Sequence, residues 1–167
     1  MDEAKLAEGV TNALIGHVKD FVKWIFSAFK SKNKRPPSQD ELKALINVLF
    51  IDDEDFNYID RIKEAGWNVN QIRDLTSLED DHLKRSHIIF LDYVGVGKSL
   101  APSEQGIGLL KAIKLKYPEK IIIFYSGHAG FSLGQEFHMA DDWMPKNSDP
   151  YIFLQKIEEN AGKVLPR

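Results

Sequence analysis

Residues 88–92 read Ile-Ile-Phe-Leu-Asp, and residues 121–126 read Ile-Ile-Ile-Phe-Tyr-Ser. In both stretches, apolar residues occupy both alternations of a strand, so both faces of each strand are predicted to be buried. A strand that is buried on both faces is typical of a parallel sheet covered by helices on its two sides. The two stretches therefore predict an α/β domain with these strands at its centre.

The alternation of strand-length apolar runs with helical stretches extends this prediction to the whole region from residue 46 onward. We expect strands over residues 47–51, 68–72, 88–91, 121–125 and 142–144. We expect helices between and after them, over residues 56–65, 78–84, 106–117, 131–138 and 149–161. Gly66 stands where a helix commonly ends, because glycine adopts the left-handed conformation of a C-terminal cap without strain.

The first 45 residues have a different organisation. Apolar residues recur at helical spacing over residues 1–30 and predict an amphipathic helix. A polar, basic and proline-containing linker follows, and Ser38-Gln-Asp-Glu41 has the capping-box pattern of a short helix ending near Leu45. We therefore divide the chain into a helix over 1–30, a linker with a short helix over 31–45, and a domain over 46–167.

Composition narrows the classes of function. Of the 167 residues, 43% are hydrophobic and 28% are charged, which is typical of a globular protein with a packed core. The net charge of −3 argues against binding to a nucleic acid backbone, which requires a basic surface. The absence of cysteine excludes disulfides, thiolate metal sites and a cysteine nucleophile.

Localisation is addressed by the hydrophobic runs and the amino terminus. No run of about 18 uncharged apolar residues indicates a transmembrane helix. The chain begins with Asp2 and Glu3, unlike the basic start of a secretory signal. We therefore expect a cytoplasmic protein.

Polar residues follow four of the expected strands. The first strand runs into Asp52 and Asp53, the third into Asp92, the fourth into Ser126, and the fifth into Pro145 followed by Lys146. Ligands of open parallel sheets bind beyond the carboxyl ends of the strands, so these side chains are expected at one rim. Taken singly, the acids could cap helices or form turns, and the lysine could be a surface charge. Their joint occurrence at four strand ends favours a functional site.

The chemistry of this set points to phosphoryl transfer. Carboxylates brought together repel one another, and Mg²⁺ is a natural neutraliser because it prefers oxygen ligands. Phosphoryl transfer requires mainly positioning and charge stabilisation. A carboxylate nucleophile, Mg²⁺, one ammonium and one hydroxyl would therefore be sufficient.

The order and spacing of these residues resemble the receiver domain of two-component response regulators, over residues 46–167. The resemblance implies a three-layer (βα)5 fold, doubly wound around a five-stranded parallel sheet. It implies that Asp52 and Asp53 are the acidic pair, Asp92 the phosphoacceptor, Ser126 the hydroxyl residue and Lys146 the lysine of the site.

The same resemblance implies a cofactor and a switch. Mg²⁺ would be bound by acidic side chains and by the backbone carbonyl two residues past the phosphoacceptor, that is by Asp52, Asp53, Asp92 and Val94. Trp143, three residues before the lysine, matches an aromatic that changes rotamer on activation. An ordinary aromatic at the rim of the core is an equally good reading of Trp143.

The function implied by the resemblance is that of a single-domain response regulator. Asp92 would accept a phosphoryl group from a histidine kinase or histidine phosphotransfer protein. The output would be a phosphorylation-dependent protein–protein interaction. Such a protein is a phosphoacceptor that assists its own phosphoryl transfer and dephosphorylation, and is not an enzyme acting on a separate substrate.

Two departures from the family leave alternatives open. The loop over 93–105 is longer than usual, and Pro145 precedes Lys146, where the family has lysine followed by proline. Both favour a receiver-like binding module that works without phosphorylation. A third hypothesis is a scaffold that acts through its N-terminal helix. Residues 10–35 could mediate self-association, or contact the inner face of a membrane through aromatic and basic side chains.

Overall fold

The computed structural model describes residues 37–127 and 138–164. The chain divides into two compact units, and the second, from Pro37 to Pro166, contains every described residue. The helix expected over 1–30, the linker before residue 37 and nearly all of the helix expected over 131–138 lie outside the described residues.

The described strands form one parallel sheet, as the sequence predicted. They are β1 (Asn47–Ile51), β2 (Asn68–Ile72), β3 (Ile88–Asp92), β4 (Ile121–Ser126) and β5 (Asp142–Pro145). The order across the sheet is β2-β1-β3-β4-β5, and every neighbouring pair is parallel. The expected bounds of β1 and β2 are confirmed to the residue, and the other three strands extend one residue further. That extra residue places Asp92 and Ser126 inside their strands.

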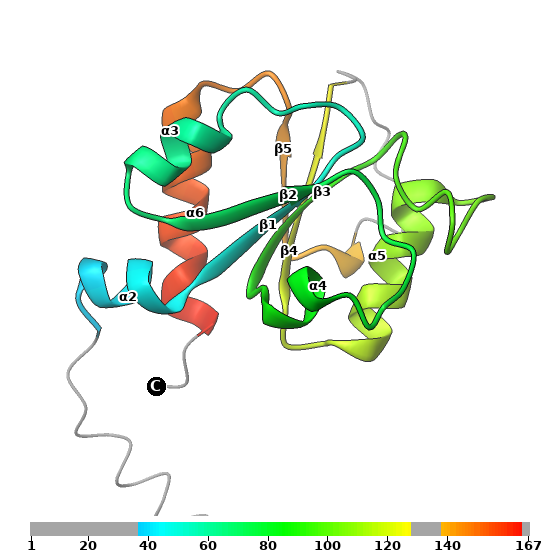
Figure 1. The fold of residues 1–167 in the computed structure, drawn as a ribbon, viewed down its shortest axis with the longest axis horizontal. Coiled ribbons are helices and arrows are strands. Elements are labelled where there is room, and N and C mark those ends of the chain that lie inside the picture. Colours follow the sequence, from blue (N-terminus) through cyan, green and yellow to red (C-terminus); the bar gives the residue numbers. More distant parts are fainter. Residues whose placement is uncertain (1–36, 128–137, 165–167) are drawn as a thin grey trace, which may run out of the picture. The chain divides into compact units, whose positions relative to one another are not determined.

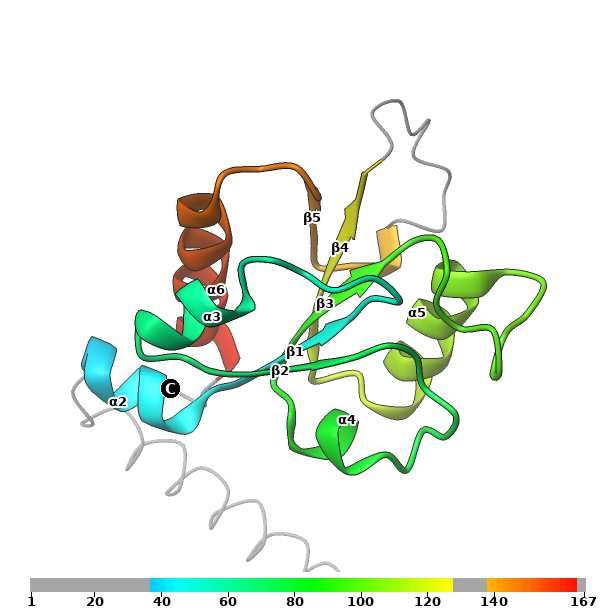
Figure 2. The same cartoon turned by 45° about the horizontal axis from the view of Figure 1, so that its top comes forward.

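Five helices are described around this sheet: α2 (Gln39–Leu45), α3 (Ile59–Glu64), α4 (Asp81–Arg85), α5 (Gln105–Lys116) and α6 (Pro150–Val164). Figures 1 and 2 show α3 and α6 on one side of the sheet and α4 and α5 on the other. The expected three-layer α/β architecture is therefore confirmed.

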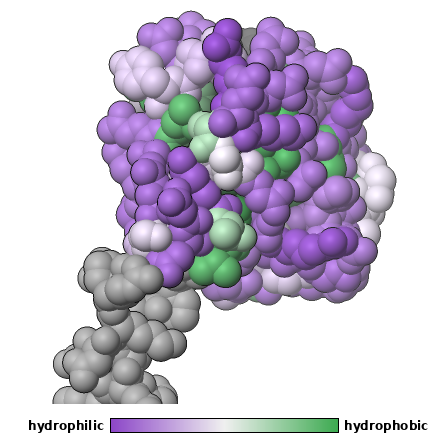
Figure 3. Space-filling model, turned by 60° about the vertical axis from the view of Figure 1, so that its left-hand side comes forward, coloured by the Kyte–Doolittle hydropathy of each residue, from purple (hydrophilic) through white to green (hydrophobic). Residues whose placement is uncertain are grey.

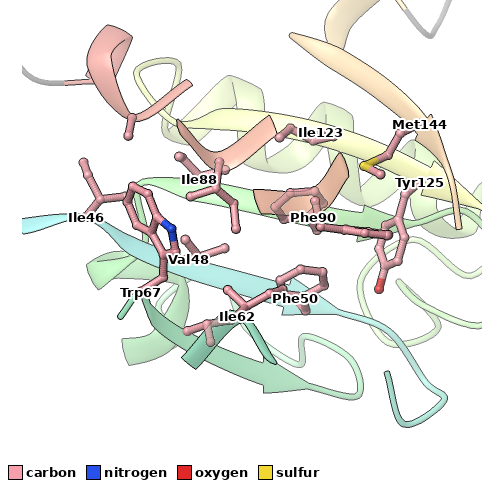
Figure 4. Close-up of a cluster of buried hydrophobic side chains, with 14 residues drawn as sticks. Ile46, Val48, Phe50, Ile62, Trp67, Ile88, Phe90, Ile123, Tyr125 and Met144 are labelled. Carbon is pink, nitrogen blue, oxygen red and sulfur yellow. The ribbon is translucent and has the colours of Figure 1, made fainter. Parts of the chain in front are cut away.

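Two hydrophobic clusters, one on each face, hold the layers together. On one face, Phe50, Phe90 and Tyr125 pack with side chains of α3 and α6. On the other face, side chains such as Leu91 pack with those of α4 and α5. All five residues of β3 are buried, as expected for a central strand that is covered on both faces. Figure 4 shows the first cluster, with Tyr125 at its end beyond Phe50 and Phe90.

Local sequence signals explain where several helices begin and end. The capping box before α2 is present, because the Ser38 side chain accepts from Glu41 N while Ser38 N donates to the Glu41 carboxylate. Gly66 follows α3 with a φ of +92°, the left-handed conformation that favours glycine. α2 belongs to the second compact unit, and the side chain of Gln39 on that helix donates a hydrogen bond to Glu158 on α6.

Two helices are shorter than expected. α3 was predicted over 56–65, but the chain first makes a turn in which Phe56 N donates to the Gln71 side chain and the Phe56 ring packs on Phe50. α4 was predicted over 78–84, but it begins only after Asp80, whose carboxylate caps it by accepting from His82 N. In both cases contacts of the preceding loop replace the first helical turn.

The outer surface on the side of α2, α3 and α6 is mostly hydrophilic, with small separate hydrophobic areas (Figure 3). None of the helices in the described part of the chain is long and apolar enough to cross a membrane.

Candidate functional site

The carboxyl ends of four strands bring the predicted site residues to one rim of the sheet. Asp52 and Asp53 follow β1 directly, Asp92 is the last residue of β3, and Ser126 is the last residue of β4. Lys146 follows β5, and its backbone N–H donates to the Ser126 carbonyl at 2.8 Å. The sheet order places β1 beside β3. At this point the order in which successive strands are added reverses from one side of β1 to the other, and such folds commonly bind ligands there.

Lys146 joins two of the carboxylates. Its Nζ lies 2.9 Å from Asp52 Oδ1 and 3.0 Å from Asp92 Oδ2. Burial alone would lower the pKa of Lys146, but hydrogen bonds to Asp52 and Asp92 outweigh it and raise the pKa above its ordinary value. Lys146 is thus a protonated cation, and it points into the site although Pro145 precedes it.

Asp52 is held rigidly beneath the rim. It is fully buried, and it accepts hydrogen bonds from the Tyr125 hydroxyl at 2.6 Å and from Glu54 N at 3.0 Å, in addition to Lys146. Burial, with the neighbouring Asp52 charge, raises the pKa of Tyr125, so its hydroxyl stays protonated and donates. Sequence reasoning missed Tyr125, because its place at the end of an apolar strand indicated only a core residue.

Asp92 has a mixed environment. Its side chain is only 8% exposed, and Oδ1 accepts from Tyr93 N at 2.7 Å while Oδ2 accepts from Lys146. Burial raises the pKa of Asp92 above its ordinary value, although the hydrogen bonds from Lys146 and Tyr93 N oppose this effect. The carboxylate is therefore oriented by fixed donors.

The three aspartates suit a divalent cation. One carboxylate oxygen from each of Asp52, Asp53 and Asp92 lies within 4.8 Å of the others. Hard oxygen donors at such separations are the ligands that Mg²⁺ accepts, so the donor set fits the expected ion. Val94 lies two residues past Asp92 in an exposed part of the following loop. The use of its carbonyl as a ligand stays a prediction.

A second lysine contacts the aspartate cluster from the loop that follows β3. Lys98, in the long loop after β3, places Nζ 3.1 Å from Asp53 Oδ2. Arg73, just past β2, donates to the Asp53 carbonyl at 2.7 Å and so fixes the backbone of the acidic loop. Neither residue was identified from the sequence, because both contacts join positions 20 to 45 residues apart.

The remaining predicted residues, Ser126 and Trp143, lie on β4 and β5. Ser126 is partly buried and pairs in register with Pro145 of β5. Trp143 is 55% exposed on β5, which is an edge strand. Its exposed position agrees with an aromatic at the rim, and its role as a switch stays a prediction.

Comparison with known proteins supports the fold assignment. No protein-family model matches this sequence, and neither does any curated protein. Solved structures do match, among them a CheY-like response regulator receiver domain protein from Methanospirillum hungatei JF-1. The two are 21% identical, the match covers 72% of this chain and 96% of the other, and the TM-score is 0.54.

Two further structures agree. Chemotaxis protein CheY4 of Vibrio cholerae is 20% identical over 69% of this chain and 98% of its own, with a TM-score of 0.55. A response regulator from Burkholderia pseudomallei, with a phosphorylated aspartic acid and a calcium ion, is 20% identical over 71% of this chain and 70% of its own, with a TM-score of 0.52. The described unit therefore has the fold of response-regulator receiver domains, and the resemblance seen in the sequence is confirmed at the level of the fold.

Proposed function

We propose that this protein is a response regulator in which Asp92 accepts a phosphoryl group from a phosphohistidine of a histidine kinase or histidine phosphotransfer protein. The observation that carries the proposal is the double contact of Lys146 Nζ with Asp52 and Asp92 at the carboxyl ends of β1 and β3. A cation so placed neutralises charge where a phosphoryl group would arrive.

The covalent step is a displacement at phosphorus. An Asp92 carboxylate oxygen forms the new P–O bond, the P–N bond of the donor phosphohistidine breaks, and its electron pair returns to the imidazole. Lys146, 3.0 Å from Asp92 Oδ2, balances the negative charge that the site gains. Asp52 keeps Lys146 in place, because it contacts the same Nζ and is itself fully buried.

Asp52, Asp53 and Asp92, with the carbonyl of Val94, would hold Mg²⁺. The bound ion would neutralise the charge of the phosphoryl oxygens as an anionic donor approaches. Asp53 is the accessible member of the three, because its side chain is 35% exposed while that of Asp52 is fully buried.

Ser126 and Trp143 carry the next part of the proposal. Ser126, at the end of β4, would donate a hydrogen bond from its hydroxyl to the aspartyl phosphate. The new contacts would bias an equilibrium between two conformations, and Trp143 would report or transmit the change to a partner protein. The protein would thus be a signalling phosphoacceptor and not an enzyme with its own substrate.

A second candidate is a receiver-like module that binds a partner without phosphorylation. The near-complete burial of the Asp92 side chain favours it, since a phosphodonor would have to reach a carboxylate that is only 8% exposed. The two candidates differ in whether Asp92 forms an acyl phosphate.

The test is intact mass spectrometry of the full chain after incubation with acetyl phosphate and Mg²⁺. The wild type and Asp60→Asn should gain one phosphoryl mass, because Asp60 is an exposed acid on α3 that pairs with Lys63 outside the site. Asp92→Asn should gain none. An adduct that persists in Asp92→Asn would refute the assignment, and no adduct on any of the three proteins would favour the second candidate.

A further inference from the structure

The loop from β3 to α5, residues 93–104 and called here the β3–α5 loop, carries a cation into the acidic site. Lys98 Nζ lies 3.1 Å from Asp53 Oδ2, and the two side chains are 62% and 35% exposed. Asp53 is the most accessible of the three aspartates whose oxygens gather within 4.8 Å of one another. Lys98 therefore occupies the side of the cluster that solvent reaches.

The backbone of this loop is anchored, so the position of Lys98 does not depend on its flexible side chain alone. The Asp74 carboxylate, just past β2, accepts from Gly97 N at 2.6 Å and from Lys98 N at 3.0 Å. Val96 is fully buried in the cluster with α4 and α5. The loop is thus held on both sides of residue 97.

Gly95 brings the same loop into contact with Asp53. A Cβ at this position would lie 2.2 Å from the Asp53 carboxylate, and the φ of +87° favours glycine. The loop backbone therefore lies directly against the carboxylate that Lys98 neutralises. The long loop thus places both the backbone of Gly95 and the ammonium of Lys98 against the Asp53 carboxylate.

Charge balance within the site gives Lys98 a specific task. Among the described ion pairs, Lys146 contacts Asp52 and Asp92 but not Asp53. Asp53 pairs with Lys98 instead. We propose that Lys98 is a built-in counter-ion for Asp53 that competes with the divalent cation and so sets the Mg²⁺ concentration at which the site becomes active. This inference rests on the proposed function, since it assigns a regulator to the same metal site.

The competition follows from electrostatics. Lys98 Nζ lies 3.1 Å from Asp53 Oδ2, so a divalent ion that binds this oxygen must displace Lys98, and a nearby ammonium repels the ion afterwards. Removing the ammonium should strengthen Mg²⁺ binding by about fivefold, equivalent to about 1 kcal/mol, the upper end for a partly exposed pair. The metal-free protein should lose stability slightly, because Asp53 then lacks this partner.

The test is calorimetric titration of the full chain with MgCl₂ at constant ionic strength. Lys98→Met should bind Mg²⁺ about fivefold more tightly than the wild type. It should also show a larger rise in melting temperature at a given Mg²⁺ concentration, since tighter binding to the folded state stabilises it more. Lys84→Met is the matched control: it removes an equal charge that pairs with Asp81 at 3.1 Å on α4. It should leave Mg²⁺ affinity at the wild-type value.

A second variant tests the anchor. Asp74→Asn removes one of the two acceptors that hold the loop, so it should also tighten Mg²⁺ binding, and the double variant with Lys98→Met should gain little beyond Lys98→Met alone. Equal or weaker Mg²⁺ binding by Lys98→Met would overturn the competition while leaving the phosphoacceptor proposal standing. Absence of Mg²⁺ binding in both wild type and Lys98→Met would overturn the metal site itself, and the competition with it.

Discussion

The hydrogen bond from Tyr125 to Asp52 offers a sharp test of how the site is held. Tyr125→Phe removes one hydroxyl and keeps the ring, which packs edge-on against Phe50 and Phe90. The lost bond is 2.6 Å long and joins two buried groups, one of them a carboxylate. Hydrogen bonds to charged groups contribute about 1.5–3 kcal/mol, so we expect a loss of about 2 kcal/mol in the free energy of unfolding.

The assay is urea unfolding of the full chain, without divalent cations, followed by far-UV circular dichroism. In thermal unfolding, the same loss of about 2 kcal/mol should lower the melting temperature by about 8 °C for a domain of this size. Tyr151→Phe is the control, because Tyr151 is 63% exposed on α6 and should change stability by less than about 0.5 kcal/mol. If Tyr125→Phe were as stable as the control, the view that Tyr125 secures Asp52 would be wrong.

Three further predictions concern the site, the core and pH. Lys146→Met leaves two buried carboxylates without their shared cation and should lower the unfolding free energy by about 3 kcal/mol in urea titrations without metal; a loss below about 1 kcal/mol would contradict the geometry. Phe90→Ala empties a fully buried position that stacks on Phe50 and should cost about 3–5 kcal/mol by the same assay. Burial, with the charge of Lys120, lowers the pKa of His87, so the folded state favours the neutral ring. Stability should then be full above the ordinary pKa of 6.5 and fall as pH drops through it towards the folded-state pKa, as read from unfolding at pH 8, 6 and 5. His87→Asn should flatten that dependence.

The predictions made from local pattern succeeded where the pattern had one physical cause. Residues 88–91 are apolar on both alternations, as expected of a strand covered on both faces, and all five residues of β3 are buried. The helix predicted over 56–65 was too long, because a contact between distant residues decides where it begins. Helical periodicity continued back to Phe56, but Phe56 N is bonded to Gln71 of β2, and a contact to another strand is invisible to a local pattern.

The sequence by itself determined the sheet and the rim on which Asp52, Asp92, Ser126 and Lys146 gather, because parallel strands end on one side and each strand is recognisable from its own residues. Only the tertiary structure decided which charges meet there. Lys98 reaches Asp53 because Asp74 holds the β3–α5 loop over the site. The path of a loop is set by hydrogen bonds and ion pairs between residues far apart in the sequence. Such contacts leave no periodic pattern in the sequence from which they could be predicted.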